Sequence, residues 1–417
     1  IEMDTYIKNK TSEFVAKMSK LQFMCGLSYL WTDNYNKPKF FIYFNKLSTV
    51  LFIAFMFSEY ASLFTQVNLS EKQASDQIIF AFAHPILMSY SWSCMYYRKD
   101  FKKILFKLSV ELKNSYNDLI IEKEMIRKAT LYSILNVLFF IAALCLYGVD
   151  ALIQIIKSDG TFTTVIMVWP DVKEKGFLPD MIRLGAYLVW WNFMVRCTAV
   201  YVLVIYLTII LSHQYRNLQS YFYNLENIFK KDNTQEGKER QYENSLKTGI
   251  ALHAETMWCV NESQRICSLV FSGQIVVNLT VFCMLMLQMV NSERTLVNAI
   301  TTLSTCVSLL LTTSFFMCNA GDITVEASNL PTAIYRSGWH QCRGKSSIRV
   351  RKLITIAIAQ SQKPVIMRSF DIIELSYSSF VTVSQLLDLI QSLRHSSFLY
   401  KSAMAFVIFV IHKEYLY

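Results

Sequence analysis

The chain has 417 residues, of which 53% are hydrophobic, 14% aromatic and 17% charged, and its formal net charge is +10. This composition excludes an ordinary soluble domain, in which about 25% of the residues are charged. The basic excess would suit a nucleic-acid binder, but such a protein needs no runs of about 20 apolar residues. Together these features favour a protein of the membrane whose lysines and arginines face the cytoplasm.

The first 46 residues are polar and basic and lack the pattern of a signal peptide, so the first apolar run is expected to act as the insertion signal. The ten cysteines include no pair with CxxC spacing, and most lie within apolar runs. They are therefore interpreted as small apolar residues, not as a disulfide framework or a zinc site.

Apolar runs of membrane-spanning length then follow along the chain. Seven spans are predicted, at residues 47–66, 74–97, 129–154, 184–212, 267–290, 296–319 and 370–387. The polar segment 213–266 keeps helical periodicity and is predicted to form long helices with a break near residues 231–233. The fold class is therefore an all-α membrane protein with seven transmembrane helices.

The distribution of basic residues predicts the orientation of these spans. Of the 41 lysines and arginines, 31 lie before the first span or in the second, fourth and sixth connections, and 8 lie on the other side. The asymmetry predicts a cytoplasmic N-terminus and an extracellular C-terminus. This topology is the reverse of that of a G-protein-coupled receptor.

No catalytic or metal-binding pattern occurs in the chain. The six histidines form no HExxH or other paired-ligand spacing, and there is no GxGxxG, P-loop or GxSxG motif. The sequence therefore indicates a protein that is not an enzyme and needs no cofactor. It also lacks the Asp-Arg-Tyr and Asn-Pro-x-x-Tyr motifs of G-protein-coupled receptors and any potassium-type filter.

The segment from Ser314 to Val383 carries a set of spaced motifs. In order, they are Cys318-Asn319-Ala320-Gly321, the pair Tyr335 and Trp339, Gln362-Lys363-Pro364, and Leu375-Ser376-Tyr377-Ser378-Ser379-Phe380. This series resembles the C-terminal signature of insect odorant receptors. The gustatory receptor family shares the inverted seven-helix plan, but its Thr-Tyr…Gln-Phe ending is not found here.

The resemblance implies a ligand-binding subunit of an odorant-gated, non-selective cation channel. Its partners would be a volatile odorant or pheromone, membrane lipid, and the odorant receptor coreceptor in a heterotetramer, with no nucleic acid. Its location would be the plasma membrane of olfactory sensory neurons. A gustatory-type receptor and a metabotropic seven-helix receptor are the alternatives. The sequence identifies neither the odorant nor the subunit stoichiometry.

The resemblance also assigns roles to the segments. Residues 1–46 would be cytoplasmic, 47–212 would hold the ligand-binding part, 267–319 spans five and six, and 370–387 the pore helix. Residues 213–266 and 320–369 would form the cytoplasmic anchor where subunits meet. The resemblance ends after Val383, so residues 388–417 form an atypical tail, and gate residues cannot be transferred to it.

The resemblance implies a ligand site in the outer halves of spans two, three, four and six, and the aromatic side chains of spans two, three and four, with a few polar groups, suit an apolar ligand. Helical spacing places several of these side chains on shared faces. The candidates are Phe80, Phe82, His84, Phe140, Leu144, Tyr147, Tyr187, Trp190, Trp191, Met194, Thr301 and Thr305.

Charged residues within or beside the spans are further functional candidates. Arg196 lies in the middle of span four and is expected to pair or to face water, with Glu59 as one partner. Asp371 and Glu374 would begin the seventh helix, where they either line a vestibule that favours cations or lie in solvent.

Overall fold

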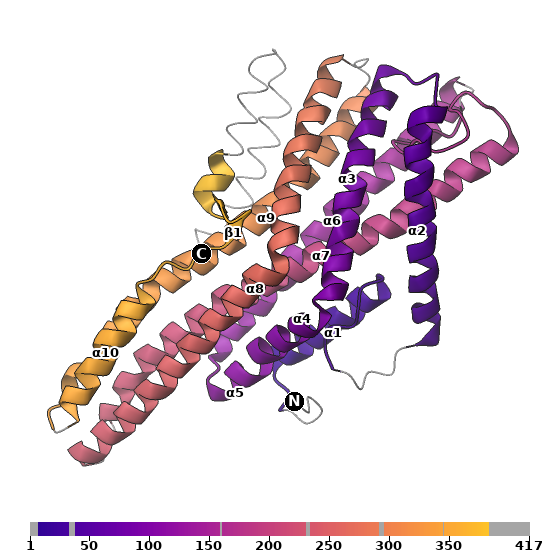
Figure 1. Ribbon diagram of the computed structural model, residues 1–417. Coiled ribbons are helices and arrows are strands. Elements are labelled where there is room, and N and C mark those ends of the chain that lie inside the picture. Colours follow the sequence, from indigo (N-terminus) through magenta and orange to yellow (C-terminus); the bar gives the residue numbers. More distant parts are fainter. Residues whose placement is uncertain are drawn as a thin grey trace.

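The computed structural model describes residues 7–32, 38–158, 161–230, 234–291, 296–344 and 346–382; within these, the side chains of residues 154, 157–158, 286–299 and 301 are not described. The tail 388–417 therefore lies outside the described residues. Almost all of the described chain is helical, as the composition predicts (Figure 1).

The N-terminal part contains one short helix and two upright ones. Helix α1 (Lys10–Met24) begins at a capping box in which the Asn9 side chain accepts from the backbone N–H of Ser12. Helices α2 (Lys39–Thr65) and α3 (Glu71–Tyr96) have 27 and 26 residues. At about 1.5 Å per residue, each is long enough to cross a bilayer.

A broken helical segment leads from α3 to the two long helices that follow. It consists of α4 (Arg98–Phe106), the π-helical turn η1 (Lys107–Glu111) and α5 (Leu112–Ser115). Helices α6 (Leu119–Ser158) and α7 (Phe177–Asn224) have 40 and 48 residues, so both extend beyond the apolar layer of a membrane.

The predicted break at residues 231–233 lies outside the described residues, but helices on both sides of it are described. The 3-10 helix η2 (Leu225–Lys230) ends directly before residues 231–233, and α8 (Gln235–Asn291) follows with 57 residues. Helix α9 (Leu296–Tyr335), the 3-10 turn η3 (Trp339–Gln341) and α10 (Ser347–Ser361) follow.

Helix α7 forms the centre of the molecule and packs against α2, α3, α6, α8 and α9 (Figure 1). The apolar stretch of α7 is 94% buried inside the protein, whereas the apolar stretch of α2 is only 17% buried. The residues of α7 are therefore buried on every side of the helix. Helix α2 instead presents most of its apolar surface outwards, as expected for a helix in contact with lipid.

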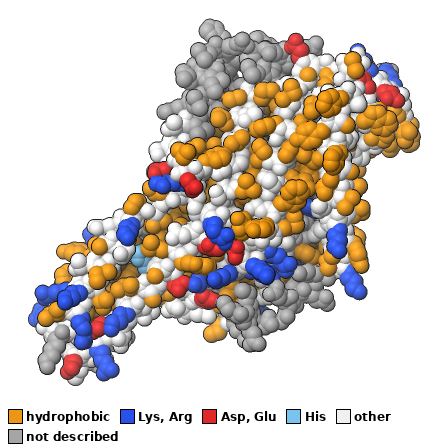
Figure 2. All heavy atoms as spheres, viewed as in Figure 1, with side chains coloured by type: hydrophobic (Ala, Val, Ile, Leu, Met, Phe, Trp, Pro, Cys, Tyr) orange, Lys and Arg blue, Asp and Glu red, His pale blue; other side chains and the backbone are white. Residues whose placement is uncertain are grey.

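Within the described residues, six helices are long and apolar enough to cross a membrane. They contain the first six predicted spans. On the face shown in Figure 2, hydrophobic side chains cover α2 and α3, whereas Lys and Arg gather mainly around α1, α4 and the far tip of α8.

The predicted start of the seventh helix was wrong. A hairpin occupies that place, with β1 (Arg368–Ser369) antiparallel to β2 (Ile373–Glu374), and helical turns begin only at residue 377. Phe370 and Asp371 have φ angles of 52° and 57°, which a helix does not allow. The described part of this helix ends at residue 382.

Candidate ligand-binding site

The centre of the candidate site is Trp190 of α7, whose side chain is only 1% exposed. Its ring lies 5.8 Å from Phe80 of α3, 6.2 Å from Tyr147 of α6 and 6.0 Å from Tyr187 of its own helix, measured between centroids. Aromatic pairs at such distances attract each other through their edges and faces. Three helices therefore meet at one indole ring.

A chain of hydrogen bonds crosses this aromatic cluster. The indole Nε1 of Trp190 donates to Nε2 of His84 at 2.9 Å. On the other side of the imidazole, Nδ1 lies 2.9 Å and 2.8 Å from the two carboxylate oxygens of Glu59 in α2. His84 and Glu59 are 0% and 1% exposed. A buried charge of this kind persists only with a hydrogen-bonding partner.

Glu59 is therefore not the partner of Arg196, which the sequence suggested. The guanidinium of Arg196 donates instead to the hydroxyl of Thr49 at 2.8 Å and, over longer distances, to the carbonyl of Asn45 and the hydroxyl of Ser48. These acceptors lie near the start of α2, whereas Glu59 lies ten residues further along. Polar groups of α2 thus accept from the two terminal nitrogens of Arg196 without a carboxylate, while its Nε has no hydrogen-bond partner.

Two tyrosines connect the cluster to its neighbours. The hydroxyls of Tyr147 in α6 and Thr305 in α9 are 2.7 Å apart. Tyr187 donates to the backbone carbonyl of Leu144 at 2.7 Å. A Cβ added to Gly148 would lie 2.5 Å from the Tyr187 hydroxyl oxygen, so this glycine allows the close approach of α6 and α7.

Not every predicted site residue joins the cluster. Leu144 and Met194 are buried in the same core, whereas Phe82 is 42% exposed and lies on the other side of α3 from Phe80 and His84. Phe140 packs against Tyr201, and Trp191 contacts Tyr187 at the edge of the group. The side chain of Thr301 lies outside the described residues.

The connection between α6 and α7 covers the site. Phe162 lies 6.0 Å from the ring of Tyr187 and is 7% exposed. The following apolar side chains are also buried; they are Val165, Ile166, Met167, Val168 and Val172. The loop therefore packs into one end of the bundle, which is called the outer end below, and the opposite end is called the inner end.

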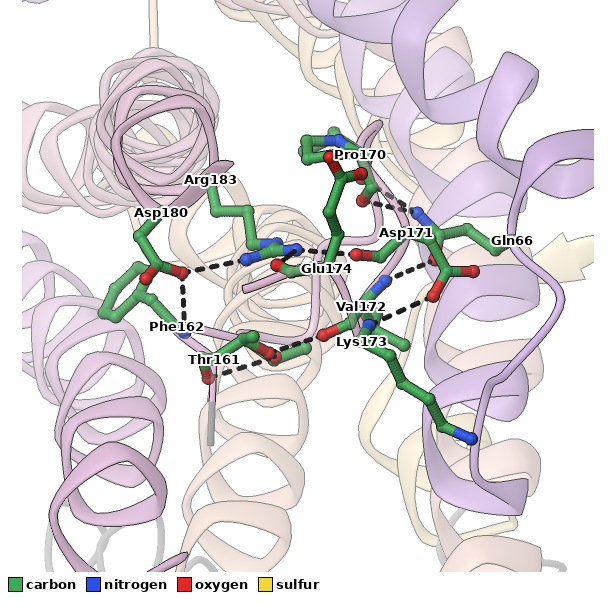
Figure 3. A network of polar contacts seen from close by, with 12 residues as sticks. Gln66, Thr161, Phe162, Pro170, Asp171, Val172, Lys173, Glu174, Asp180 and Arg183 are labelled. Atoms are coloured by element: carbon green, nitrogen blue, oxygen red, sulfur yellow. Dashed lines mark hydrogen bonds and ion pairs between the residues drawn. The ribbon is translucent and has the colours of Figure 1, made fainter. Parts of the chain in front are cut away.

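Figure 3 shows the polar contacts that hold this loop. Arg183 donates to the carboxylate of Asp180 at 2.8 Å and to the backbone carbonyls of Asp171 and Glu174 at 2.6 Å and 2.9 Å. Gln66, at the end of α2, donates to the carbonyls of Val168 and Pro170. Hydrogen bonds thus connect the loop to Gln66 at the end of α2 and to Arg183 of α7, and the loop covers the outer end of the site.

Sequence reasoning missed several members of the site. Phe55 and Phe193 lie 5.8 Å and 5.7 Å from the imidazole of His84, and Phe162 comes from the loop. Phe193 could have been found, because it lies three residues from Trp190 on the same face of α7. Phe162 has no local signal, because only the folded loop brings it to Tyr187.

At the inner end of the bundle, α6 and α9 meet the beginning of the predicted pore helix. The ammonium of Lys128 lies 2.9 Å from the carboxylate of Asp322, which also accepts a hydrogen bond from the hydroxyl of Tyr377. Asp371 and Glu374, by contrast, are exposed on the hairpin, and Glu374 lies 3.7 Å from Arg368. Their role in a vestibule stays a prediction.

Comparisons with known proteins agree with this architecture. A family model described as "7tm Odorant receptor" matches residues 71–387. No curated protein sequence matches the chain. Two structures of the insect olfactory receptor OR5 from Machilis hrabei are similar in fold, both at 12% identity. The complex with eugenol has a TM-score of 0.75 and covers 91% of this chain and 97% of that one; the other structure has 0.74, with 92% and 98%.

Proposed function

The chain belongs to the odorant receptor family, as its C-terminal motifs predict, and on this premise we propose that it is the ligand-binding subunit of an odorant-gated, non-selective cation channel. The other subunit is the odorant receptor coreceptor, in a heterotetramer at the plasma membrane of olfactory sensory neurons. The ligand is a volatile apolar odorant or pheromone. The N-terminus is cytoplasmic and the C-terminus extracellular.

The observation that carries this proposal is the buried aromatic cluster around Trp190, beneath the loop that holds Phe162. Aromatic walls with a few fixed polar groups suit a small apolar ligand. Eugenol, which is present in one structure of the similar OR5, is a molecule of this kind.

Contacts along α6 and α9 support a coupling between ligand binding and the pore. At the outer end, Tyr147 of α6 binds Thr305 of α9. At the inner end, Lys128 of α6 and Asp322 of α9 form the ion pair that Tyr377 joins. The same two helices thus touch both the cluster and the start of the last helix. A ligand opens the channel by this route only if it binds the open state more tightly.

The test is a recording of odour-evoked current from the chain expressed together with the coreceptor, in excised patches without nucleotides. An odour panel should evoke current in this preparation, both with the full chain and with the chain truncated after Val383. Current that requires G-protein turnover would favour a metabotropic receptor instead. If no odour evokes current while both subunits are at the cell surface, the channel proposal is refuted.

The orientation has its own test. An epitope tag placed before Met3 should remain inaccessible to antibodies on intact cells and become accessible after permeabilisation. The basic side chains around α1, α4 and the tip of α8 support this orientation, because Lys and Arg concentrate on the cytoplasmic side. Labelling of intact cells would reverse the assignment.

A further inference from the structure

The hydrogen bonds around His84 fix its protonation. An indole N–H can only donate, so Nε2 of His84 accepts from Trp190. The imidazole proton must then be on Nδ1, where it is donated to Glu59. A charged imidazolium would carry a second hydrogen on Nε2, against the Trp190 N–H, so the imidazole is neutral. Both carboxyl oxygens of Glu59 lie within 2.9 Å of Nδ1, the arrangement of a carboxylate that accepts through either oxygen.

This pair is a strong hydrogen-bond acceptor in apolar surroundings. An ionised carboxylate behind Nδ1 increases the basicity of the opposite nitrogen, as it does for histidines elsewhere. The rings of Phe55, Phe80 and Phe193 lie 5.8 Å, 5.4 Å and 5.7 Å from the imidazole and offer no polar atom. The only described donor to Nε2 is Trp190.

We propose that the Trp190 N–H occupies the place of a ligand hydroxyl, and that the ligand of this receptor is an alcohol or phenol whose O–H inserts between Trp190 and His84. The inference rests on the proposed function, since it names the chemical class that the ligand site selects. The inserted oxygen accepts from Nε1 of Trp190 and donates to Nε2 of His84.

A hydroxyl replaces the existing bond without loss, because its oxygen both accepts a hydrogen bond and donates one. An ether or ester oxygen accepts from Trp190 but leaves Nε2 of His84 without a donor. An ammonium group donates to His84 but leaves the Trp190 N–H without an acceptor. Both outcomes leave a buried polar group unsatisfied, which costs far more than a hydrogen bond gains. The Glu59–His84–Trp190 chain thus acts as a filter for hydroxyl-bearing ligands.

Insertion of the hydroxyl also changes contacts between helices outside the ligand site. A hydroxyl oxygen cannot enter the 2.9 Å bond between Nε1 and Nε2 unless the indole moves away from the imidazole. The indole packs against Tyr147, whose hydroxyl contacts Thr305 of α9. Hydroxyl binding therefore displaces the indole that packs against Tyr147, the residue whose hydroxyl joins α6 to α9.

The test is the thermal unfolding of the purified, detergent-solubilised receptor with pairs of alcohols and their methyl ethers. Suitable probes are benzyl alcohol, 2-phenylethanol, 1-hexanol and 1-octanol, each with its ether. At least one alcohol should raise the unfolding temperature at a concentration about tenfold or more below that of its ether, because the ether leaves Nε2 unsatisfied. Equal effects within every pair, or no effect of any alcohol, would refute the proposal.

Two variants and a control locate the effect. His84→Asn keeps a donor for Glu59 but removes Nε2, so the preference for alcohols should vanish. His213→Asn is the matched control, since His213 is a buried histidine of α7, 5% exposed, that lies outside the cluster. This control should keep the preference for alcohols.

Trp190→Phe removes the competing donor and should lower the alcohol concentration needed to raise the unfolding temperature. A preference for alcohols that is unchanged in both His84→Asn and Trp190→Phe contradicts the proposal.

The same probes separate this inference from the channel proposal. Alcohol-selective stabilisation without current in coexpressing cells would uphold the hydroxyl filter and refute the channel. Currents that do not distinguish alcohols from their ethers would uphold the channel and refute the filter.

Discussion

The outer and inner ends of the bundle use polar groups in different ways. At the outer end, the buried polar chain of Glu59, His84 and Trp190 is surrounded by aromatic rings. At the inner end, charged and polar side chains of α1, α5, α6, α7 and α9 form a dense network; they are Thr11, Lys113, Asp118, Glu122, Lys128, Asn217, Ser220 and Asp322.

The difference has a physical reason. An aromatic pair contributes only about 0.5–1.5 kcal/mol beyond the area that it buries, so an aromatic cluster can rearrange around a ligand at modest cost. Charged hydrogen bonds are stronger and more directional, so they hold one arrangement. The outer end is therefore suited to binding, and the inner end to keeping the helices in register. Each of the following changes tests one side of this contrast.

The largest effect on stability is expected when the hydrogen bond between Glu59 and His84 is broken. His84→Leu leaves the carboxylate of Glu59 buried without a partner, which should lower the free energy of unfolding by about 3–5 kcal/mol. The double variant Glu59→Met with His84→Leu removes the charge as well and should recover most of the loss. Thermal unfolding of the purified receptor measures both. A single variant as stable as the double one would contradict an ionised Glu59.

At the inner end, replacing Lys113 should stabilise the protein, whereas His84→Leu at the outer end should destabilise it. Its ammonium nitrogen is buried without a hydrogen bond, and burial lowers the pKa of Lys113 to about 8 despite the nearby carboxylates of Glu122 and Asp118. Lys113→Met should therefore raise the free energy of unfolding near neutral pH by about 2–3 kcal/mol.

The pH dependence of Lys113 has a definite sign. Between pH 8 and 10.5, the unfolded chain holds a proton that the folded chain has released. In this window the contribution of Lys113 to stability rises with pH, and below it the penalty is constant. Unfolding of the native chain and of Lys113→Met, measured from pH 7 to 10.5, should converge as the pH increases. A constant difference would mean that Lys113 has an ordinary pKa.

A smaller effect is expected where α6 touches α7. Gly148→Ala places a methyl group against the Tyr187 hydroxyl and should destabilise the protein by about 1–3 kcal/mol through overpacking. Gly185→Ala in α7 is the control, because no atom lies within 4 Å of the added Cβ. It should be neutral or stabilising by up to about 1 kcal/mol, since alanine favours helices. Equal results for the two variants would show that the approach at Gly148 is not tight.

The smallest effect on stability should come from Tyr377→Phe. The Lys128–Asp322 pair that Tyr377 joins is partly exposed, with side chains 23% and 21% accessible, so the lost hydrogen bond is worth about 1 kcal/mol or less. If α6 and α9 couple the ligand site to the pore, the maximal odour-evoked current should change while the thermal shift by ligand stays the same. Unchanged currents would remove this contact from the coupling route.

Much of the fold could be predicted from local patterns. Runs of apolar residues located the six described spans, and the polar break near residues 231–233 coincides with the end of η2. The seventh helix was misplaced at its start, because Pro364 suggested an early break and nothing local indicated the hairpin at residues 368–374. Pairing between two-residue strands leaves almost no periodic signal.

The candidate site was predicted only in part. Helical spacing correctly placed Tyr147, Tyr187 and Trp190 on faces that meet. It could not say that Phe82 would face outwards, because an apolar residue towards lipid looks the same as one towards the core. The sequence also suggested Arg196 as a partner of Glu59, which is wrong. It shows that the two side chains carry opposite charges but not at which level of the bundle each one lies.

The sequence by itself determined the family, the helical class of the fold and the position of the first six predicted spans, because each depends on composition, periodicity and short motifs. The tertiary structure decided which helices meet, and with that the bond from Glu59 to His84 and Trp190 and the burial of Phe162 beside Tyr187. The reason is that apolar composition places helices in the bilayer but does not pair them, because lipid is as apolar as a neighbouring helix. Partners between helices are selected only by the detailed shape and hydrogen bonding of side chains far apart in the chain.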